Sequence, residues 1–193
     1  MRKATLTDYA SGIAYGTGRI ASEKGKTYLH ARNKEEYYLK ILEAETGYRV
    51  YKSSDGRGGI QWNIKARNVE QLPPLPEIRE PKEFIRAYIE LHAVLDLANA
   101  TTRQGKKIKI LRLRIYGSEE TLSWINENLP AGKKKMQYIK NKTGEYTGET
   151  CALYYQSKKE IPDILGWIDG IPKNEEVWKK WDKVLKEARE YSR

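Results

Sequence analysis

Three segments of the chain alternate apolar with polar residues at a period of two. They are TYLHAR at residues 27–32, IQWNIKAR at 60–67 and IKILRLRIYG at 108–117. Successive side chains of a β-strand point to opposite faces, so this period predicts strands with one buried and one polar face. In the third segment the alternation changes phase near Ile110, which predicts a β-bulge at that position.

Helices are predicted between these strands, because apolar residues there recur at helical spacing behind capping residues. The predicted caps are Thr7, Asn33 with Glu36 as a capping box, Ser118, and Ser157 with Glu160 as a second capping box. Gly47 is expected to end the second helix in the left-handed conformation, and Pro162 to delay the start of a later one. Two more helices are predicted, over residues 82–92 behind Pro81 and over 174–191.

The same order of elements occurs twice along the chain: helix, hairpin, helix, hairpin and helix. The middle helices of the two copies match at a constant offset of 84 residues, which aligns Tyr38 with Leu122 and Ile41 with Ile125. A proline-rich piece at 73–81 cannot continue a strand or a helix and therefore predicts a linker. The predicted organisation is a first half at 1–72, this linker, and a second half at 82–193.

The composition favours a polyanionic partner such as nucleic acid. Lys and Arg number 36 against 26 Asp and Glu, for a formal net charge of +10. A solvated basic surface is the alternative explanation. The single Cys151 excludes an internal disulfide, and no apolar run approaches the roughly 20 residues of a membrane span. An intracellular, cytoplasmic protein without a membrane partner is expected.

Other familiar catalytic or metal-binding patterns are absent from the sequence. His30 and His92 are the only histidines and lie far apart, so a transition-metal site is not expected. Cys151 lies in a strand-like run, where a small buried residue is the expected role. The GRGG segment at 56–59 lacks the lysine of a phosphate-binding loop and predicts a hairpin turn.

Four segments carry a resemblance to a known family. They are ASGIAYGTG at 10–18, FIRAYIELHA at 84–93, RLRIYGSEETLSWI at 112–125 and YYQSKKEIPDILGWI at 154–168. Together with the repeated order of elements, they make the chain resemble a single-chain LAGLIDADG homing endonuclease. The resemblance implies an α+β fold of two pseudo-symmetric αββαββα halves, paired through their leading helices, with a concave sheet surface that binds DNA.

The resemblance also implies roles for individual residues. Gly12, Gly16 and Ala87 are expected at the contact between the leading helices. The metal-binding acid that the family carries at the end of each leading helix falls on Thr17 and His92, and neither is a carboxylate.

The nearest carboxylates in the second half are Glu90 and Asp96. Glu90 is rotated by about 200° from the required face of the helix. Asp96 is on that face only if the helix continues past His92. No metal site is therefore predicted, and Mg²⁺ is expected only if the chain is an active endonuclease.

The run KMQYIKNKTGEYTGETCALYYQ at 135–156 predicts a further hairpin. The polar positions of the three alternating segments and of the end of this run are the predicted DNA-binding residues, because arginine and amide side chains can make paired hydrogen bonds to base edges. They are Tyr28, His30, Arg32, Gln61, Asn63, Lys65, Arg67, Arg112, Arg114, Tyr116, Tyr154 and Gln156. The favoured hypothesis is a monomeric double-stranded DNA-binding protein that has lost cleavage and has a regulatory role. An active metal-dependent endonuclease and a maturase-like factor that binds structured RNA are the alternatives.

Overall fold

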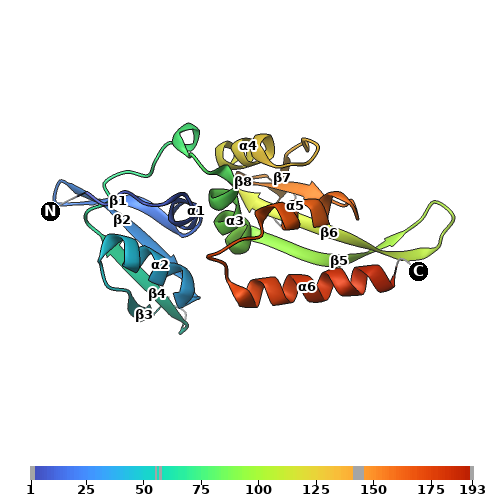
Figure 1. Ribbon diagram of the computed structural model, residues 1–193, viewed down its shortest axis with the longest axis horizontal. Coiled ribbons are helices and arrows are strands. Elements are labelled where there is room, and N and C mark those ends of the chain that lie inside the picture. The colour runs from blue at the N-terminus through green and yellow to red at the C-terminus, as the bar shows by residue number, and fades with distance from the viewer. Residues whose placement is uncertain (1–2, 55, 57, 141–145, 192–193) are drawn as a thin grey trace. The chain divides into compact units, whose positions relative to one another are not determined.

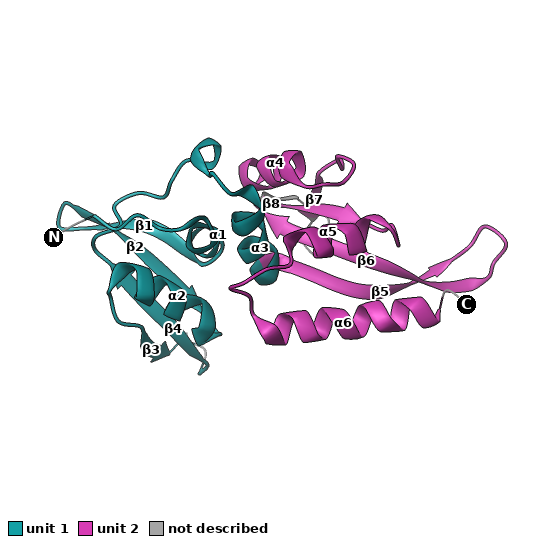
Figure 2. Ribbon diagram, in the orientation of Figure 1, with its two compact units in different colours: residues 1–91 teal, residues 92–193 magenta. Residues whose placement is uncertain are grey.

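The computed structural model describes residues 3–54, 56, 58–140 and 146–191 (Figure 1). The chain divides into two compact units, residues 1–91 and 92–193 (Figure 2). Each unit contains one four-stranded antiparallel sheet with helices packed beside it. The predicted α+β class is therefore confirmed.

The first unit contains the elements up to the end of the leading helix of the second repeat. They are α1 (Asp8–Thr17), β1 (Gly18–Glu23), β2 (Lys26–Asn33), α2 (Glu36–Thr46), β3 (Tyr51–Ser54), β4 (Ile60–Ala66), the 3₁₀ helix η1 (Leu75–Glu77) and α3 (Pro81–His92). The strand order in its sheet is β1-β2-β4-β3.

The second unit repeats this arrangement after α3. Its elements are β5 (Ala93–Thr101), β6 (Lys107–Gly117), α4 (Glu119–Asn128), β7 (Gln137–Lys140), β8 (Tyr146–Tyr155), α5 (Glu160–Ile168) and α6 (Glu175–Glu190). Its strand order is β5-β6-β8-β7, the order of the first sheet carried over element by element. The boundary between the two compact units falls between Leu91 and His92, within α3. The predicted division at 73–81 concerns the repeat in the sequence and stays a prediction.

Helices cover one face of each sheet. In the first unit, Leu29 and Ala31 of β2 and Ile64 and Ala66 of β4 are fully buried in a cluster with apolar residues of α1 and α2. In the second unit the corresponding buried residues are Leu111, Leu113, Ile115, Leu153 and Tyr155. Buried with them are Leu122 and Ile125 of α4, Ile161, Ile164, Leu165 and Ile168 of α5, and Trp178, Trp181 and Ala188 of α6. The opposite face of each sheet therefore carries the polar half of the alternation.

Most of the predicted caps are present. The hydroxyl of Thr7 accepts a hydrogen bond from the Ala10 amide at 3.3 Å, and that of Ser118 accepts one from the Thr121 amide at 3.3 Å. Gly47 ends α2 at φ 73°, a conformation that a side chain would disfavour. Ser157 accepts a hydrogen bond from the Glu160 amide at 3.1 Å, which is one half of the predicted capping box. The Glu160 carboxylate instead accepts hydrogen bonds from Lys134 Nζ at 2.8 and 2.9 Å.

Two details of the predicted caps are wrong. The Asn33 side chain accepts a hydrogen bond from the Glu35 amide, so it forms a local turn before α2 and no capping box with Glu36. Pro162 does not delay α5, which begins at Glu160. Proline is tolerated there because amides of the first helical turn have no intrahelical partner.

The predicted bulge near Ile110 and the predicted offset of 84 are also wrong. β5 and β6 pair without interruption from Ala93–Ile115 to Thr101–Lys107. The change of phase instead places Ile108 and Ile110 on the face of Arg112, where the two strands run on past β8. The buried residues Leu39 and Leu42 of α2 correspond to the buried residues Leu122 and Ile125 of α4. The offset between the two middle helices is therefore one residue shorter than predicted.

Candidate nucleic-acid interface

Thr17 and His92 are the last residues of α1 and α3, and each is followed immediately by a strand. The Thr17 hydroxyl donates a hydrogen bond to the Ile13 carbonyl at 2.8 Å, so it pairs with a backbone carbonyl in the last turn of its own helix. His92 lies in the last turn of α3, where the helix dipole favours a cation. Both residues therefore occupy equivalent positions in the two repeats, and neither supplies an anionic oxygen.

The two nearby carboxylates have other partners. Glu90 is only 5% exposed and accepts a hydrogen bond from the Tyr9 hydroxyl at 2.8 Å. Burial, reinforced by the charge of Glu90, raises the pKa of Tyr9 well above its usual value, so Tyr9 stays protonated as a donor. Asp96 lies in β5, because α3 ends at His92. Within the described part of the chain, no three His, Cys, Asp or Glu side chains are grouped to hold a metal ion.

The contact between α1 and α3 depends on Gly12. A β-carbon at Gly12 would lie 2.4 Å from the Phe84 carbonyl oxygen and 2.9 Å from the Ala87 β-carbon, so only glycine permits this approach. Beside it, the ring of Tyr15 meets that of Phe84 edge-on at 5.2 Å. Gly16 lies one turn further along α1 and is half-buried.

The polar face of the first sheet carries its basic residues in cross-strand rows. Arg19, His30 and Lys65 lie directly opposite one another on β1, β2 and β4. Burial, followed by the charges of Arg32, Lys65 and Arg19, lowers the pKa of His30 below its usual value. His30 is therefore neutral at pH 7 in the free protein, and the positive charge of this row comes from Arg19 and Lys65.

The remaining predicted residues of the first unit differ in accessibility. Arg32 is exposed, whereas its neighbour on β4, Asn63, is 3% exposed and donates to the Ser53 hydroxyl at 2.7 Å. Tyr28 is almost buried, and the Lys65 ammonium lies 5.8 Å from the centre of its ring. Gln61 shares this face of β4, and Arg67 follows in the turn after the strand.

The polar face of the second sheet centres on two arginines of β6. Arg112, Arg114 and Tyr116 lie on this face, with Tyr154 of β8 directly opposite Arg114. Gln156 follows immediately after β8 and is exposed.

On the same face, Asp96 lies opposite Arg112, on the neighbouring strand β5 that pairs with the other edge of β6. It accepts hydrogen bonds from Arg112 Nε at 2.9 Å, Arg112 Nη2 at 2.8 Å and Arg114 Nη2 at 2.6 Å. The Arg112 hydrogen bond, reinforced by the charges of both arginines, holds the pKa of Asp96 below its usual value. Both carboxylate oxygens are thus committed to arginine.

The strand registers show which predicted residues occupy equivalent positions in the two sheets. Ala31 lies opposite the residue that follows α1, and Ile115 lies opposite the residue that follows α3. Counting from these positions, the equivalent pairs are Tyr28 and Arg112, His30 and Arg114, Arg32 and Tyr116, Lys65 and Tyr154, and Arg67 and Gln156. The two faces therefore place different side chains at the same points of the fold.

Beyond Arg112 the polar face becomes apolar. Ala98 lies opposite Ile110, and Ala100 lies opposite Ile108, which is 37% exposed. These four residues form an apolar strip on the two-stranded part of the β5–β6 hairpin, next to the Asp96–Arg112 pair. Small apolar side chains of this kind can contact thymine methyl groups in the major groove of DNA.

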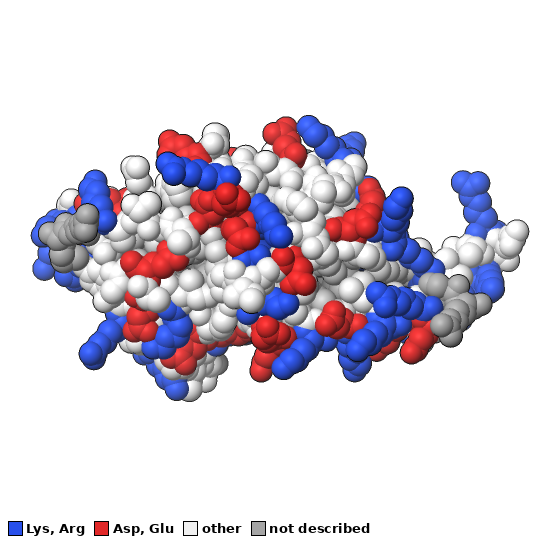
Figure 3. All heavy atoms as spheres, viewed as in Figure 1, with Lys and Arg blue, Asp and Glu red and all other residues white. Residues whose placement is uncertain are grey.

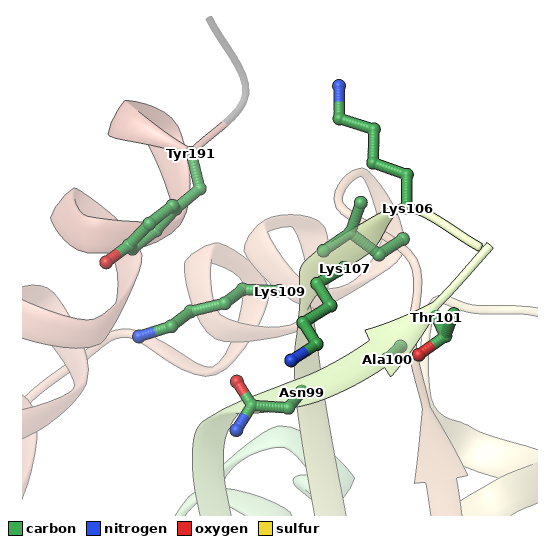
Figure 4. A pocket seen from close by; sticks show the side chains of 8 residues that line it. Asn99, Ala100, Thr101, Lys106, Lys107, Lys109 and Tyr191 are labelled. Carbon is green, nitrogen blue, oxygen red and sulfur yellow. The ribbon is translucent and has the colours of Figure 1, made fainter.

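A basic hollow of about 650 Å³ lies beside the same hairpin, where Asn99, Thr101, Lys107 and Lys109 of the other face meet Ala100 and Ile108 of the strip (Figure 4). It is lined by Asn99, Ala100, Thr101, Lys106, Lys107, Ile108, Lys109 and Tyr191. The Lys109 ammonium lies 4.7 Å from the centre of the Tyr191 ring, which connects the hairpin to the end of α6. In Figure 3, Lys and Arg side chains gather at this end of the second unit, whereas acidic and basic groups are mixed over the helices.

Sequence reasoning missed Arg19 and Asp96 as interface residues. Both lie on strands that directly follow a helix without a loop, and neither GRIASE nor AVLDLANAT alternates strongly enough to predict a strand. The usable signal was the repeat itself, because a hairpin needs a first strand before each recognised second strand.

Two expectations about the rest of the chain can be compared with the structure. Cys151 is 1% exposed, and burial raises the pKa of its thiol, as expected for a packing residue. Among the described residues, no helix has both the length and the apolar character needed to cross a bilayer.

The chain was compared with known proteins at three levels. No protein-family model matches it. No curated protein sequence matches it. Solved structures do match, and the three described next contain DNA.

The I-LtrWI LAGLIDADG homing endonuclease bound to target DNA matches with a TM-score of 0.61 at 10% identity, covering 94% of this chain and 91% of that one. The I-SmaMI LAGLIDADG homing endonuclease bound to cleaved DNA matches with a TM-score of 0.60 at 9% identity, covering 98% and 92%. The LAGLIDADG meganuclease I-AabMI bound to uncleaved DNA matches with a TM-score of 0.63 at 8% identity, covering 95% and 92%. The chain therefore has the two-half fold of the single-chain LAGLIDADG homing endonucleases.

Proposed function

We propose that this chain binds double-stranded DNA through the helix-free faces of its two sheets and does not cleave it. The observation that carries the proposal is the pair of polar faces, on which arginine, lysine, histidine and tyrosine lie opposite one another across neighbouring strands. The solved proteins of the same fold are DNA-bound endonucleases, which supports duplex DNA as the partner.

The chemistry of these faces suits a duplex. Two-stranded β-ribbons fit the major groove, and arginine can donate two parallel hydrogen bonds to guanine. Lysine contributes charge toward phosphates, and the net charge of +10 adds a favourable, salt-dependent contribution to binding. The first face supplies Arg19, Arg32 and Lys65, and the second supplies Arg112 and Arg114.

The absence of cleavage is proposed from the helix ends. Mg²⁺ prefers oxygen ligands that include at least one carboxylate, and the groups at these positions are a threonine hydroxyl and an imidazole. The threonine hydroxyl already donates to Ile13, and the nearest acids are occupied by Tyr9 and by two arginines. These residues do not fit a catalytic metal, so no hydrolytic step is derived for this chain.

The proposal extends to a monomeric, intracellular protein with a regulatory role, since a chain with two such halves presents both binding faces without a partner copy. An active endonuclease and an RNA-binding maturase-like factor are the competing outcomes of the tests. The endonuclease alternative predicts metal-dependent cutting of duplex DNA by the purified protein. The maturase-like alternative predicts a preference for folded RNA over duplex DNA.

The binding test uses fluorescence anisotropy with a labelled duplex that the parent protein has selected from a random pool. Arg112→Ala with Arg114→Ala should weaken binding by about 1–3 kcal/mol per base-reading contact and reduce the salt slope. Lys179→Ala with Lys180→Ala is the matched control, because it removes the same charge from exposed positions of α6. Equal losses of affinity in both double variants would show that Arg112 and Arg114 contribute only through the net charge of the protein. Tighter binding to folded RNA than to duplexes would support the maturase-like alternative.

A further inference from the structure

We propose that Asp96 is a positioning residue that determines which base pairs the second sheet prefers, by holding Arg112 and Arg114 in fixed orientations. This inference rests on the proposed binding of duplex DNA. It concerns how the arginines are used rather than whether the chain binds.

The orientation of Arg112 is fixed by two hydrogen bonds to one carboxylate. Asp96 Oδ1 accepts from Nε at 2.9 Å, and Oδ2 accepts from Nη2 at 2.8 Å. A guanidinium has five N–H donors in one plane, so this contact uses one edge and leaves the Nη1–Nη2 end for a second bidentate partner. That end has the geometry needed for the O6 and N7 atoms of guanine.

Arg114 is fixed by the same carboxylate. Its Nη2 donates to Asp96 Oδ2 at 2.6 Å, and its guanidinium carbon lies 5.9 Å from the centre of the Tyr116 ring. The arginine side chains are 25% and 20% exposed, so they are held at the surface where a groove can meet them. Fixed rotamers lose less conformational entropy when a base is bound.

Asp96 also alters the charge of the cluster. Two arginines without it would form a doubly positive site that attracts any phosphate, whereas the three side chains together carry one positive charge. A carboxylate beside the arginines repels phosphate oxygens, and repulsion of the wrong group is one source of specificity. The lowered pKa of Asp96 keeps it charged throughout the neutral range.

The equivalent point of the first sheet lacks this arrangement. Ala21 of β1 lies opposite Tyr28 of β2, at the position that Asp96 and Arg112 occupy in the second sheet. The effect of Asp96 is therefore confined to the bases contacted by the second sheet.

The test is selection from a random duplex pool, followed by sequencing of the bound fraction. With Asp96→Asn, discrimination at one or two neighbouring base pairs should fall by about 5- to 150-fold, while affinity for unselected duplexes stays equal or rises. Glu23→Gln is the control, since it removes one negative charge from the same kind of sheet face without touching an arginine pair. It should leave the selected bases unchanged.

Arg112→Lys provides a second variant that keeps every charge and removes the planar fork. It should lose the same base preference as Asp96→Asn. An unchanged set of selected bases in the folded Asp96→Asn variant would overturn the role of Asp96, whatever Arg112→Lys does. Failure of the parent protein to bind any duplex would instead overturn the proposed function, so the two failures are distinguishable.

Discussion

Gly12 lies on the face of α1 that packs against α3, where there is no room for a β-carbon. The clashing atom is the Phe84 carbonyl oxygen, which belongs to the backbone and cannot rotate away. Gly12→Ala should therefore lower the free energy of unfolding by about 1–3 kcal/mol, measured by urea denaturation. Gly166→Ala is the control, because its β-carbon would meet nothing within 4 Å and should stabilise α5 by about 0.5–1 kcal/mol. Equal effects of the two changes would contradict the close contact at Gly12.

His30 makes stability depend on pH. Its folded pKa lies below the ordinary value of 6.5, so the unfolded chain binds the proton more readily. The stabilisation is complete above pH 6.5 and decreases as the pH falls toward the folded pKa. As the pH falls below 6.5, the parent should lose more unfolding free energy than His30→Gln. Parallel pH profiles of the two proteins would show that burial and the charges of Arg32, Lys65 and Arg19 do not lower the pKa of His30.

The β5–β6 hairpin continues past β8 as a two-stranded ribbon, and its apolar strip supports a prediction about the bases it meets. Ala98, Ala100, Ile108 and Ile110 offer methyl groups but no donors or acceptors, so the bases at this strip should include thymine. Replacing thymine with deoxyuridine in a selected duplex removes only the methyl groups. Affinity should fall at the positions contacted by this strip and remain unchanged elsewhere. Equal affinity for both duplexes at every position would place the strip outside the groove.

At the scale of elements, the sequence predicts most of the fold because the repeat and the caps agree. Thr7, Ser118 and Gly47 act as expected, and the alternating segments form β2, β4 and β6. The first strand of each leading hairpin was not identified, because β1 and β5 are stabilised by pairing with β2 and β6 rather than by their own pattern. The phase change at Ile110 predicts a bulge, but the strand is continuous there, because a strand whose outer face changes from polar to apolar gives the same sequence pattern as a bulge.

The candidate interface was predictable in part for the same reason. Positions on recognised strands, such as Arg112 and Arg114, follow from the alternation, whereas the partner of both, Asp96, depends on where α3 ends. Neither the burial of Asn63 nor that of Tyr28 can be deduced from a period of two, because it depends on neighbours from other strands.

At the scale of the whole molecule, the two sheets share one topology but differ in the side chains at equivalent points. Arg112 corresponds to Tyr28, and Tyr154 corresponds to Lys65. A surface of this kind predicts a bound sequence without two-fold symmetry. Selection from a random duplex pool should yield such a sequence, and a palindrome would contradict the assignment of both faces to DNA.

The central claim is that the chain binds duplex DNA without cutting it, and following both end-labelled strands of a selected duplex tests it most directly. The protein is added in Mg²⁺ or Mn²⁺, and the same samples are run on native and denaturing gels. We expect a shifted complex whose two strands keep their full length, because Thr17 and His92 supply no carboxylate at the helix ends. Metal-dependent shortening of either strand, abolished by Glu90→Gln or Asp96→Asn, would contradict it, as would the absence of any shifted complex.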